Sequence, residues 1–275
     1  MQRLKKKKNG INFKFIFFTI IFIIIFLVII NLVLKYKNYI VEEYKDYDYV
    51  GTSFAKKANP IILNNIIIGG IFEDKFVTSD KYYKYSKNKQ GTILSTYTLT
   101  GKAGHYTLNT INNANGNYYG YIDKVDDISE YLSVNEGTVY KVEEIKDNLP
   151  EYEKYVKQAT LKYSYLNSSV KIIKAYRCNS SYIITAINSD NNGAYATIVY
   201  VDETGNSNIV KYNYLKNIEK PDKFKIYFLK FVTDLDNDNN IELVISETTK
   251  NTTKYSVLEK NKNKFYEILQ TEVLN

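Results

Sequence analysis

Cysteine and histidine each occur once among the 275 residues, proline occurs three times, and tryptophan does not occur. Because Cys178 has no second cysteine to pair with, a disulfide within the chain is excluded. With His105 as the sole histidine, the common zinc sites built from several Cys and His ligands are excluded as well. Stability must therefore come from a hydrophobic core, and a region of about 240 residues is long enough to bury one.

Acidic side chains are absent from residues 1–14, and charge of either sign is absent from residues 15–34. The first segment is rich in Lys, whereas the second is apolar except for Thr19 and Asn31. Twenty residues at ~1.5 Å rise form a helix about 30 Å long, which matches the hydrocarbon core of a bilayer. We predict a cytoplasmic basic tail at 1–14 and a transmembrane helix at 15–34 that contacts the lipid bilayer.

Neither a small-residue A-x-A cleavage site nor a cysteine follows the apolar run. The run therefore indicates an uncleaved signal-anchor, rather than a cleaved signal peptide or a lipoprotein anchor. Because positive charge favours the cytoplasmic side, residues 35–275 are expected outside the cell. The predicted location is the cell membrane, with a single pass, a cytoplasmic N-terminus and an extracytoplasmic C-terminal region.

The net charge of +7 comes almost entirely from the N-terminal tail. Six of the 37 basic side chains lie in residues 1–14, so the rest of the chain has 31 basic and 30 acidic side chains. A nearly balanced region without a basic groove is not typical of nucleic-acid binding, and we expect no nucleic-acid partner.

Beyond the membrane segment, the pattern of apolar residues is mainly that of β-strands. Residues 35–59 are polar and predict a stalk, and residues 60–146 alternate apolar and polar positions, which predicts a small antiparallel β-rich domain. Gly69-Gly70 is read as a turn between two β-branched runs. Residues 147–168 have apolar positions at helical spacing, with Asn148 as the expected N-cap, and predict one connecting helix.

Residues 169–275 contain eight strand-like runs joined by turn-like sequences such as "NSDNNG" and "DETGN". The runs divide into two similar halves, and we predict a β-meander domain made of two four-strand meanders. Two units are too few to close a propeller, so we expect two packed sheets.

The second meander contains the acidic stretch "DLDNDNNIEL", residues 234–243. Its acids fall at positions one, three, five and nine, and Ca²⁺ takes about six to eight oxygen ligands of this kind. Position twelve of a helix-loop-helix calcium loop requires a bidentate Glu, but Ile245 stands there, so the helical version is disfavoured. The predicted metal ligands at the loop 234–242 are Asp234, Asp236, Asp238, Asn240 through its carbonyl, and Glu242.

This stretch resembles the calcium loop of integrin-alpha-type (FG-GAP) repeats, with the pattern D-x-D-x-D-G-x-x-[DE]-[LI]. The resemblance implies a structural calcium ion between two strands, and no enzymatic activity. One position departs from the pattern, because Asn239 replaces the glycine at the sixth position. More broadly, the chain looks like uncharacterised membrane-anchored extracytoplasmic proteins of low-GC Gram-positive bacteria.

Other interpretations of the acids and aromatics stay open at this point. The acidic loop could be a solvated turn or a catalytic cluster, and pairs such as Asp126-Asp127 or Glu143-Glu144 could serve glycoside hydrolysis. Tyr119 and Tyr121 would share one face of a strand, where tyrosine suits glycan or protein contacts.

The sequence as a whole favours a single-pass, membrane-anchored extracytoplasmic binding or scaffold protein with one structural calcium site. Its expected partners are a cell-wall glycan or an envelope protein. The alternatives are a cell-envelope-directed hydrolase that uses carboxylates and a membrane-tethered sensor. No spacing of residues singles out a catalytic acid and base, so a non-enzymatic role is favoured.

Overall fold

The computed structural model describes residues 58–86, 91–123, 128–160, 170–190, 193–216 and 221–275. These residues belong to one compact unit. The basic tail, the transmembrane segment 15–34 and nearly all of the stalk 35–59 lie outside the described residues, so those predictions are not tested. Among the described residues, no helix is long and apolar enough to cross a membrane.

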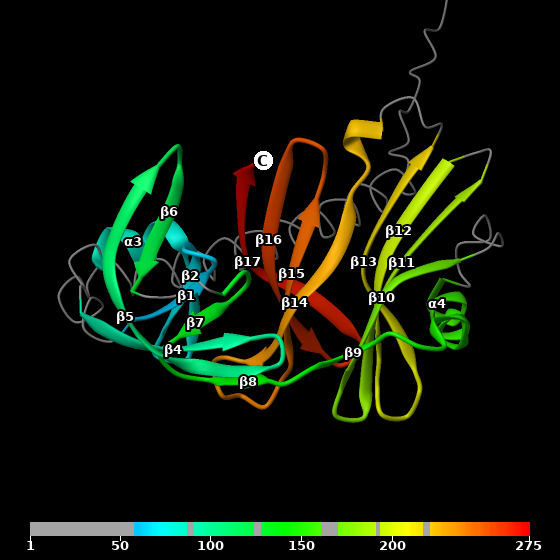
Figure 1. Ribbon diagram of the computed structural model, residues 1–275, viewed down its shortest axis with the longest axis horizontal. Helices are drawn as coiled ribbons and strands as arrows, with labels where there is room; N and C mark the ends of the chain where they lie inside the picture. Colours follow the sequence, from blue (N-terminus) through cyan, green and yellow to red (C-terminus); the bar gives the residue numbers. More distant parts are fainter. Residues whose placement is uncertain (1–57, 87–90, 124–127, 161–169, 191–192, 217–220) are drawn as a thin grey trace, which may run out of the picture. The chain divides into compact units, whose positions relative to one another are not determined.

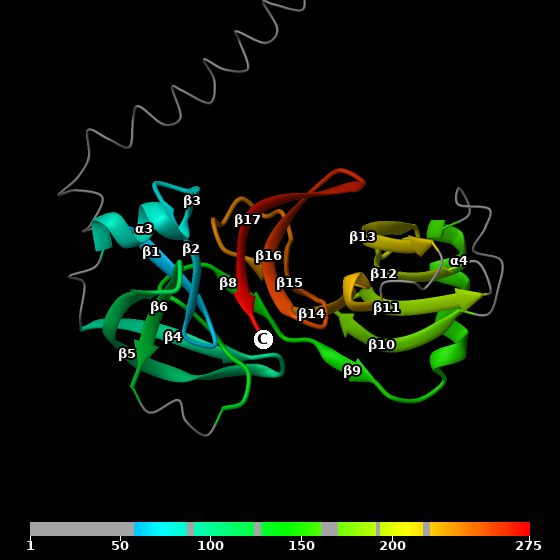
Figure 2. The ribbon, with the colours of Figure 1, turned by 90° about the horizontal axis from the view of Figure 1, so that it is seen from above.

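The prediction of a mainly β, antiparallel fold is confirmed (Figure 1). The first sheet has the strand order β1-β7-β4-β5-β6-β2-β3, and an additional pairing of β1 with β2 closes six of its strands into a barrel (Figure 2). Helix α3 follows β3 and contacts β2. The elements are β1 (Asn59–Leu63), β2 (Ile66–Phe72), β3 (Lys75–Thr78), α3 (Ser79–Ser86), β4 (Thr92–Thr98), β5 (Gly101–Ala114), β6 (Asn117–Ile122) and β7 (Leu132–Val134).

The turn expected at Gly69-Gly70 is wrong, because both glycines lie inside β2. A Cβ on Gly69 would lie 2.6 Å from the carbonyl oxygen of Val77, so the glycines allow close packing and do not mark a turn. The chain turns instead at Asn64 and Asn65, which have φ angles of 48° and 65°. Two consecutive left-handed residues form the type I′ turn that suits a two-residue hairpin, and Asn tolerates this backbone.

Two antiparallel meanders of four consecutive strands make up the C-terminal part, and each is extended by one short strand from earlier in the chain. Strands β8 and β9 lie within the range 60–146, yet β8 pairs with β14 and β9 pairs with β10, so strand pairing crosses the boundary that we expected at residue 146. The elements are β8 (Thr138–Tyr140), β9 (Glu143–Ile145), β10 (Lys171–Cys178), β11 (Ser181–Asp190), β12 (Gly193–Val201), β13 (Ser207–Lys216), η2 (Pro221–Lys223), β14 (Ile226–Asp234), β15 (Glu242–Thr248), β16 (Thr252–Asn261) and β17 (Lys264–Leu274).

Three groups of buried side chains hold these sheets together. The two meanders pack face to face, with residues such as Ile198 of one sheet and Leu243 of the other in one cluster, which agrees with the packed two-sheet arrangement that the sequence favours. The other face of the β14–β17 sheet packs on the barrel, where Phe231 meets Ile61 and its neighbours. Alternation along each strand therefore supplies apolar residues to two cores at once.

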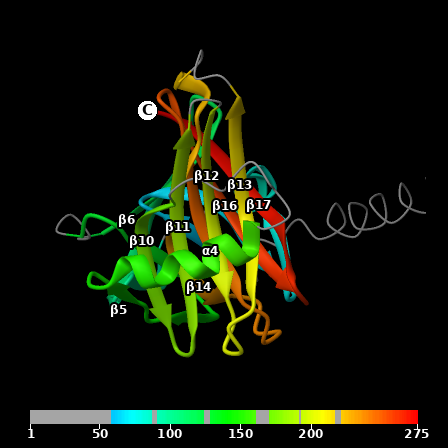
Figure 3. The same ribbon diagram turned by 90° about the vertical axis from the view of Figure 1, so that its right-hand side faces the viewer.

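The connecting helix covers the remaining face of the first meander. It begins as a 3₁₀ turn, η1 (Leu149–Tyr152), and continues as α4 (Glu153–Thr160), while residues 161–168 of the expected helix lie outside the described residues. Helix α4 lies across the β10–β13 sheet (Figure 3), and Val156 is buried in a cluster with apolar side chains of that sheet. Asn148 stands at the expected N-cap position, but its backbone is left-handed and its side chain makes no capping hydrogen bond.

Candidate metal centre

The acidic loop connects two antiparallel strands, as its flanking sequence predicts. Strand β14 ends at Asp234 and β15 begins at Glu242, and the neighbouring pair Thr233 and Glu242 lie opposite each other in the ladder. The first and last predicted ligands are therefore fixed by regular sheet structure. The residues between them have to fold back within a short turn at one end of the sheet.

Two asparagines give this turn its shape. Asn237 and Asn239 have φ angles of 60° and 66°, which is the left-handed region. Asn239 is the residue that replaces glycine in the calcium-loop pattern, and asparagine adopts this conformation more readily than most other non-glycine residues. The loop therefore reaches the backbone conformation for which the pattern normally uses glycine.

A second segment packs on the loop from outside. Gly137, in the turn between β7 and β8, has a φ of 94°, and a Cβ there would lie 2.7 Å from the Cα and carbonyl oxygen of Leu235. The adjacent strand β8 pairs Thr138 with Asp234. The loop is consequently braced by a turn roughly 100 residues earlier in the chain.

The four predicted carboxylate ligands come together. Each residue places one carboxylate oxygen so that these atoms all lie within 4.8 Å of one another: Asp234, Asp236, Asp238 and Glu242. The side chains change from buried at the two strand ends to exposed at the tip of the loop. The cluster could therefore hold a metal ion that is partly shielded from solvent.

Hydrogen bonds satisfy only part of this cluster. One oxygen of Glu242, Oε2, accepts hydrogen bonds from the backbone N–H of Leu235 at 2.8 Å and from the hydroxyl of Thr233 at 3.1 Å. Its other oxygen, Oε1, is buried without a hydrogen-bond partner, and so are the Oδ1 atoms of Asp234 and Asp236. Glu242 is 0 % exposed and Asp234 is 6 % exposed, so solvent does not compensate.

An unpaired buried carboxylate oxygen is costly, and three in one place are a specific anomaly. Coordination to a cation would satisfy all three at once, because each would then have a positive partner. This observation is independent of the sequence pattern, since it depends on burial and on the direction of the hydrogen bonds.

The raised pKa values of two carboxyl groups in the metal-free cluster also indicate a site that favours a cation. Burial, together with the carboxylates of Asp236 and Asp234, raises the pKa of Glu242 to about 8, against the opposing hydrogen bonds from Leu235 and Thr233. Burial and the neighbouring Asp238 raise the pKa of Asp236 to about 6. The protein therefore holds carboxyl groups in a place where their charge is unfavourable unless a cation is added.

The remaining predicted ligand, Asn240, lies in the same loop and donates two hydrogen bonds to the carboxylate of Asp238. Its backbone N–H donates to Oδ1 of Asp238 at 2.7 Å, and its side-chain amide donates to Oδ2 at 2.5 Å. The carbonyl ligand expected of Asn240 stays a prediction. Glu247, which the sequence places beyond the loop, forms an ion pair with Lys225 at 2.6 Å instead.

Sequence reasoning missed three supporting residues. Thr233 donates its hydroxyl to Glu242, Gly137 packs against the loop backbone, and Tyr140 has a pKa raised by burial first and then by Asp234, Cys178 and Glu242. The position of Thr233 directly before the first acid was visible in the sequence. The other two reach the loop only through the pairing of β8 with β14.

The other carboxylate candidates have structural partners. Glu143 forms an ion pair with Arg177, and Glu144 forms one with Lys174 at 3.2 Å. Residues 126–127 lie outside the described residues. Exposed, ion-paired carboxylates of this kind are typical of a protein surface.

Tyr119 and Tyr121 do share a face, with ring centroids 6.3 Å apart in a stacked arrangement. Cys178 is buried at the end of β10, where burial raises the pKa of its thiol. This is the environment of a structural thiol and not of a nucleophile.

Comparison with protein-family models, with curated proteins and with solved structures gives no match for the chain. What the site can do follows from its own chemistry. A set made only of carboxylates is suited to a hard cation and not to a soft or nitrogen-preferring metal.

Proposed function

We propose that the protein is a membrane-anchored extracytoplasmic binding or scaffold protein whose acidic loop binds one structural calcium ion. The single observation that carries the metal proposal is the convergence of four carboxylates in the loop that joins β14 to β15, three of which have a buried oxygen without a hydrogen-bond partner. The membrane proposal rests on the sequence of residues 1–34.

The size of the cluster favours calcium over magnesium. Oxygen ligands on opposite sides of Ca²⁺, at 2.3–2.6 Å from the ion, are roughly 4.6–5.2 Å apart, whereas those of Mg²⁺ are roughly 4.0–4.2 Å apart. The four carboxylate oxygens all lie within 4.8 Å of one another, and this spacing accommodates the larger ion. Magnesium also keeps several waters and an ideal octahedron, which a loop with four carboxylates does not favour.

We further propose that the loop is of the type found in integrin-alpha-type (FG-GAP) repeats. Its support is the strand–loop–strand context, the acids at alternate positions and the left-handed backbone at Asn239. In such a loop the ion is structural, because it holds two strand ends together and contacts no substrate. The resemblance to membrane-anchored extracytoplasmic proteins of low-GC Gram-positive bacteria is also part of this proposal.

Binding or scaffolding is favoured over the two alternatives. A hydrolase would need a second, unpaired pair of carboxylates in a cleft, and the described candidates Glu143 and Glu144 are ion-paired. No feature of the described residues specifically favours a membrane-tethered sensor. A cell-wall glycan or an envelope protein remains the proposed class of partner.

Calcium binding is tested by thermal unfolding of the full chain in calcium and in chelator. If Kd is ~10⁻⁴ M, millimolar calcium adds roughly 1–2 kcal/mol to the free energy of unfolding, which raises Tm by roughly 2–8 °C for a domain of this size. Asp236→Ala should abolish the shift, whereas Asp222→Ala, an exposed aspartate outside the cluster, should keep it. An equal Tm in calcium and in chelator for the unmodified chain would refute the proposal.

Location is tested separately with reporters fused after Asn275. A reporter that folds only outside the cytoplasm is expected to be active in bacterial cells, and one that works only in the cytoplasm is expected to be inactive. The opposite pattern would contradict the proposed orientation. Deleting residues 15–34 should move the protein from the membrane fraction to the soluble fraction.

A further inference from the structure

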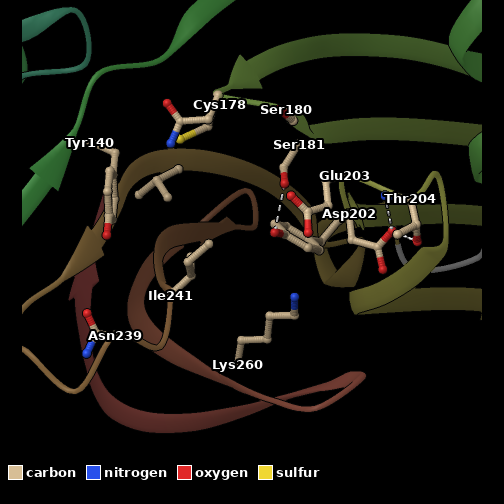
Figure 4. A pocket seen from close by; sticks show the side chains of 13 residues that line it. Tyr140, Cys178, Ser180, Ser181, Asp202, Glu203, Thr204, Asn239, Ile241 and Lys260 are labelled. Carbon is tan, nitrogen blue, oxygen red and sulfur yellow. Dashed lines mark hydrogen bonds between the residues drawn. The ribbon is translucent and has the colours of Figure 1, made fainter.

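A cleft of about 420 Å³ lies at the end of the two packed meanders, beside the acidic loop (Figure 4). Its walls come from the turn between β10 and β11, from the turn after β12, from the acidic loop, from β16 and from β8. A volume in this range is sufficient for a small ligand. No continuous segment forms the cleft, so it exists only because the two sheets pack with their turns at the same end.

The inner part of the cleft is apolar and already organised. Cys178, Val232 and Tyr200 are buried there. The hydroxyl of Tyr200 hydrogen-bonds the hydroxyl of Ser181 at 2.9 Å, and the ammonium group of Lys260 lies 4.6 Å from the centre of the Tyr200 ring. A rigid apolar floor with fixed polar atoms at its edge is typical of a small-molecule site.

The rim carries polar groups of both kinds. Asn179, Asn239 and Glu203 are exposed, and among the described residues their side chains have no hydrogen-bond partner. Lys260, whose ammonium group projects into the cleft in Figure 4, has no carboxylate in ion-pair contact within the described part of the chain. The rim therefore offers amides that both donate and accept, one acceptor carboxylate and one donor ammonium.

Asp202 differs from these rim side chains, because its carboxylate already accepts hydrogen bonds within its own turn. Its Oδ1 accepts hydrogen bonds from the backbone and hydroxyl of Thr204, at 3.0 and 2.6 Å, and from the backbone of Asn206 at 2.9 Å. These bonds fix the shape of the turn that carries Glu203. The wall on this side is preorganised, so a ligand would not have to pay for ordering it.

The charges of the cleft exclude most classes of ligand. Asp202 and Glu203 oppose a phosphate or another polyanion, while Lys260 opposes a simple cation. The polar rim is unsuited to a lipid chain. What fits is a neutral molecule with many hydroxyl groups, because each hydroxyl can donate and accept, and because an amide or carboxylate presents two polar atoms side by side to neighbouring hydroxyls. The partly exposed ring of Tyr140 adds an apolar face.

We infer that this cleft is a binding site for a short, neutral saccharide. The proposal deepens the proposed function and rests on it in one respect: Asn239 and Ile241 stand between the calcium ligands Asp238 and Glu242, so an ion in the loop fixes one wall of the cleft. Saccharide affinity should accordingly be higher with calcium than with chelator.

The test uses the full chain and a panel of neutral oligosaccharides, including maltotriose and N,N′-diacetylchitobiose, titrated by isothermal calorimetry in calcium and in chelator. At least one is expected to bind with 1:1 stoichiometry. Asn179→Gly and Lys260→Met each remove one contact and should weaken binding by about tenfold, which corresponds to about 1.4 kcal/mol. The matched control Lys250→Met changes an exposed lysine at the opposite end of the same sheet and should bind normally.

Asn239→Gly separates the cleft from the ion. Glycine suits the left-handed backbone at this position and restores the glycine of the calcium-loop pattern, so the calcium-dependent rise in Tm should persist while saccharide affinity falls. A calcium-dependent Tm without binding of any saccharide at millimolar concentration would overturn the cleft proposal alone. Saccharide binding that survives all three cleft substitutions would overturn it as well. A third outcome would be saccharide binding that the cleft substitutions weaken, with the same affinity in calcium and in chelator and no effect of calcium on Tm. That outcome would refute the calcium site and its effect on saccharide affinity, and would leave the cleft proposal intact.

Discussion

Replacing Glu242 by Gln should stabilise the protein without calcium and remove its response to calcium. Glu242 is fully buried, and its pKa in the metal-free protein is raised from an ordinary 4.5 to about 8, by burial first and by the neighbouring carboxylates second. Because the folded-state pKa is the higher one, the neutral acid is favoured in the folded protein. Stability from this group is thus complete below about pH 4.5 and is lost as the pH rises through about 8.

The magnitude follows from the size of the shift. A difference of one pKa unit between the folded and unfolded states corresponds to 1.36 kcal/mol. Between pH 5.5 and pH 8, the loss of unfolding free energy caused by Glu242 grows by the equivalent of a little over two pKa units. In chelator, the free energy of unfolding should therefore fall by about 3 kcal/mol more in the unmodified protein than in Glu242→Gln over this interval. With saturating calcium the trend should reverse, since an ion bound as proposed would hold the ionised carboxylate, and deprotonation would then favour the folded state.

The assay is urea denaturation of the full chain, followed by far-ultraviolet circular dichroism of the β-sheets at both pH values. Glu247→Gln is the matched control, because Glu247 lies on the same strand but pairs with Lys225 at the other end. It should keep the calcium response. If the unmodified protein and Glu242→Gln have the same pH dependence in chelator, the reasoning about the buried carboxylate is refuted.

Three further predictions concern the framework of the fold, all measured by urea denaturation. Gly69→Ala should cost about 1–3 kcal/mol, since its Cβ would lie 2.6 Å from a backbone oxygen of the adjacent strand; a neutral effect would contradict the close packing. Val156→Ala should cost about 1.5–2 kcal/mol by removing part of the apolar contact between α4 and its sheet, and a value near zero would mean that the helix is not docked. Glu267→Gln should cost about 0.5–1 kcal/mol at pH 7: burial favours the neutral acid, but Lys211 and Lys254 outweigh it and lower the pKa. That contribution is present above the ordinary pKa and disappears as the pH falls through the lowered value, so an equal loss at pH 3 would refute it.

Strand positions could be predicted from the sequence because alternation is a local signal. Every strand-like run from residue 171 onward became a strand, since each alternates apolar residues between two cores. Turns were harder to predict. Gly69-Gly70 was expected to form a turn but permits close packing, whereas the left-handed turn at Asn64-Asn65 was not predicted. Glycine can mark either a turn or a close contact between strands, and asparagine can also supply the left-handed residues of a turn. Only the tertiary structure shows which role a given residue has.

In the candidate site, too, the local features were predictable from the sequence, and the long-range contacts were not. Its carboxylates were predictable because they lie within nine residues and their spacing directs them to one point. The contact of Gly137 with the loop was not predictable, because no sequence pattern near residue 137 indicates packing against a loop roughly 100 residues later. Closure of the barrel by β1 and β2 was not predictable either, since sheet closure depends on pairing among strands that are distant in sequence.

The short strands β8 and β9 give the chain a constraint on the order of its assembly. They are synthesised before both meanders, but β8 pairs with β14, roughly 90 residues further along, and β9 pairs with β10. During translation these two strands have no partners, and the edges that they later cover belong to sheets that do not yet exist. Strand β9 can pair once β10 has been synthesised, whereas the ladder between β8 and β14 can form only late in synthesis. The capture of β8 by β14 should be among the last events of folding, and a second copy of the chain could compete for that position at high concentration.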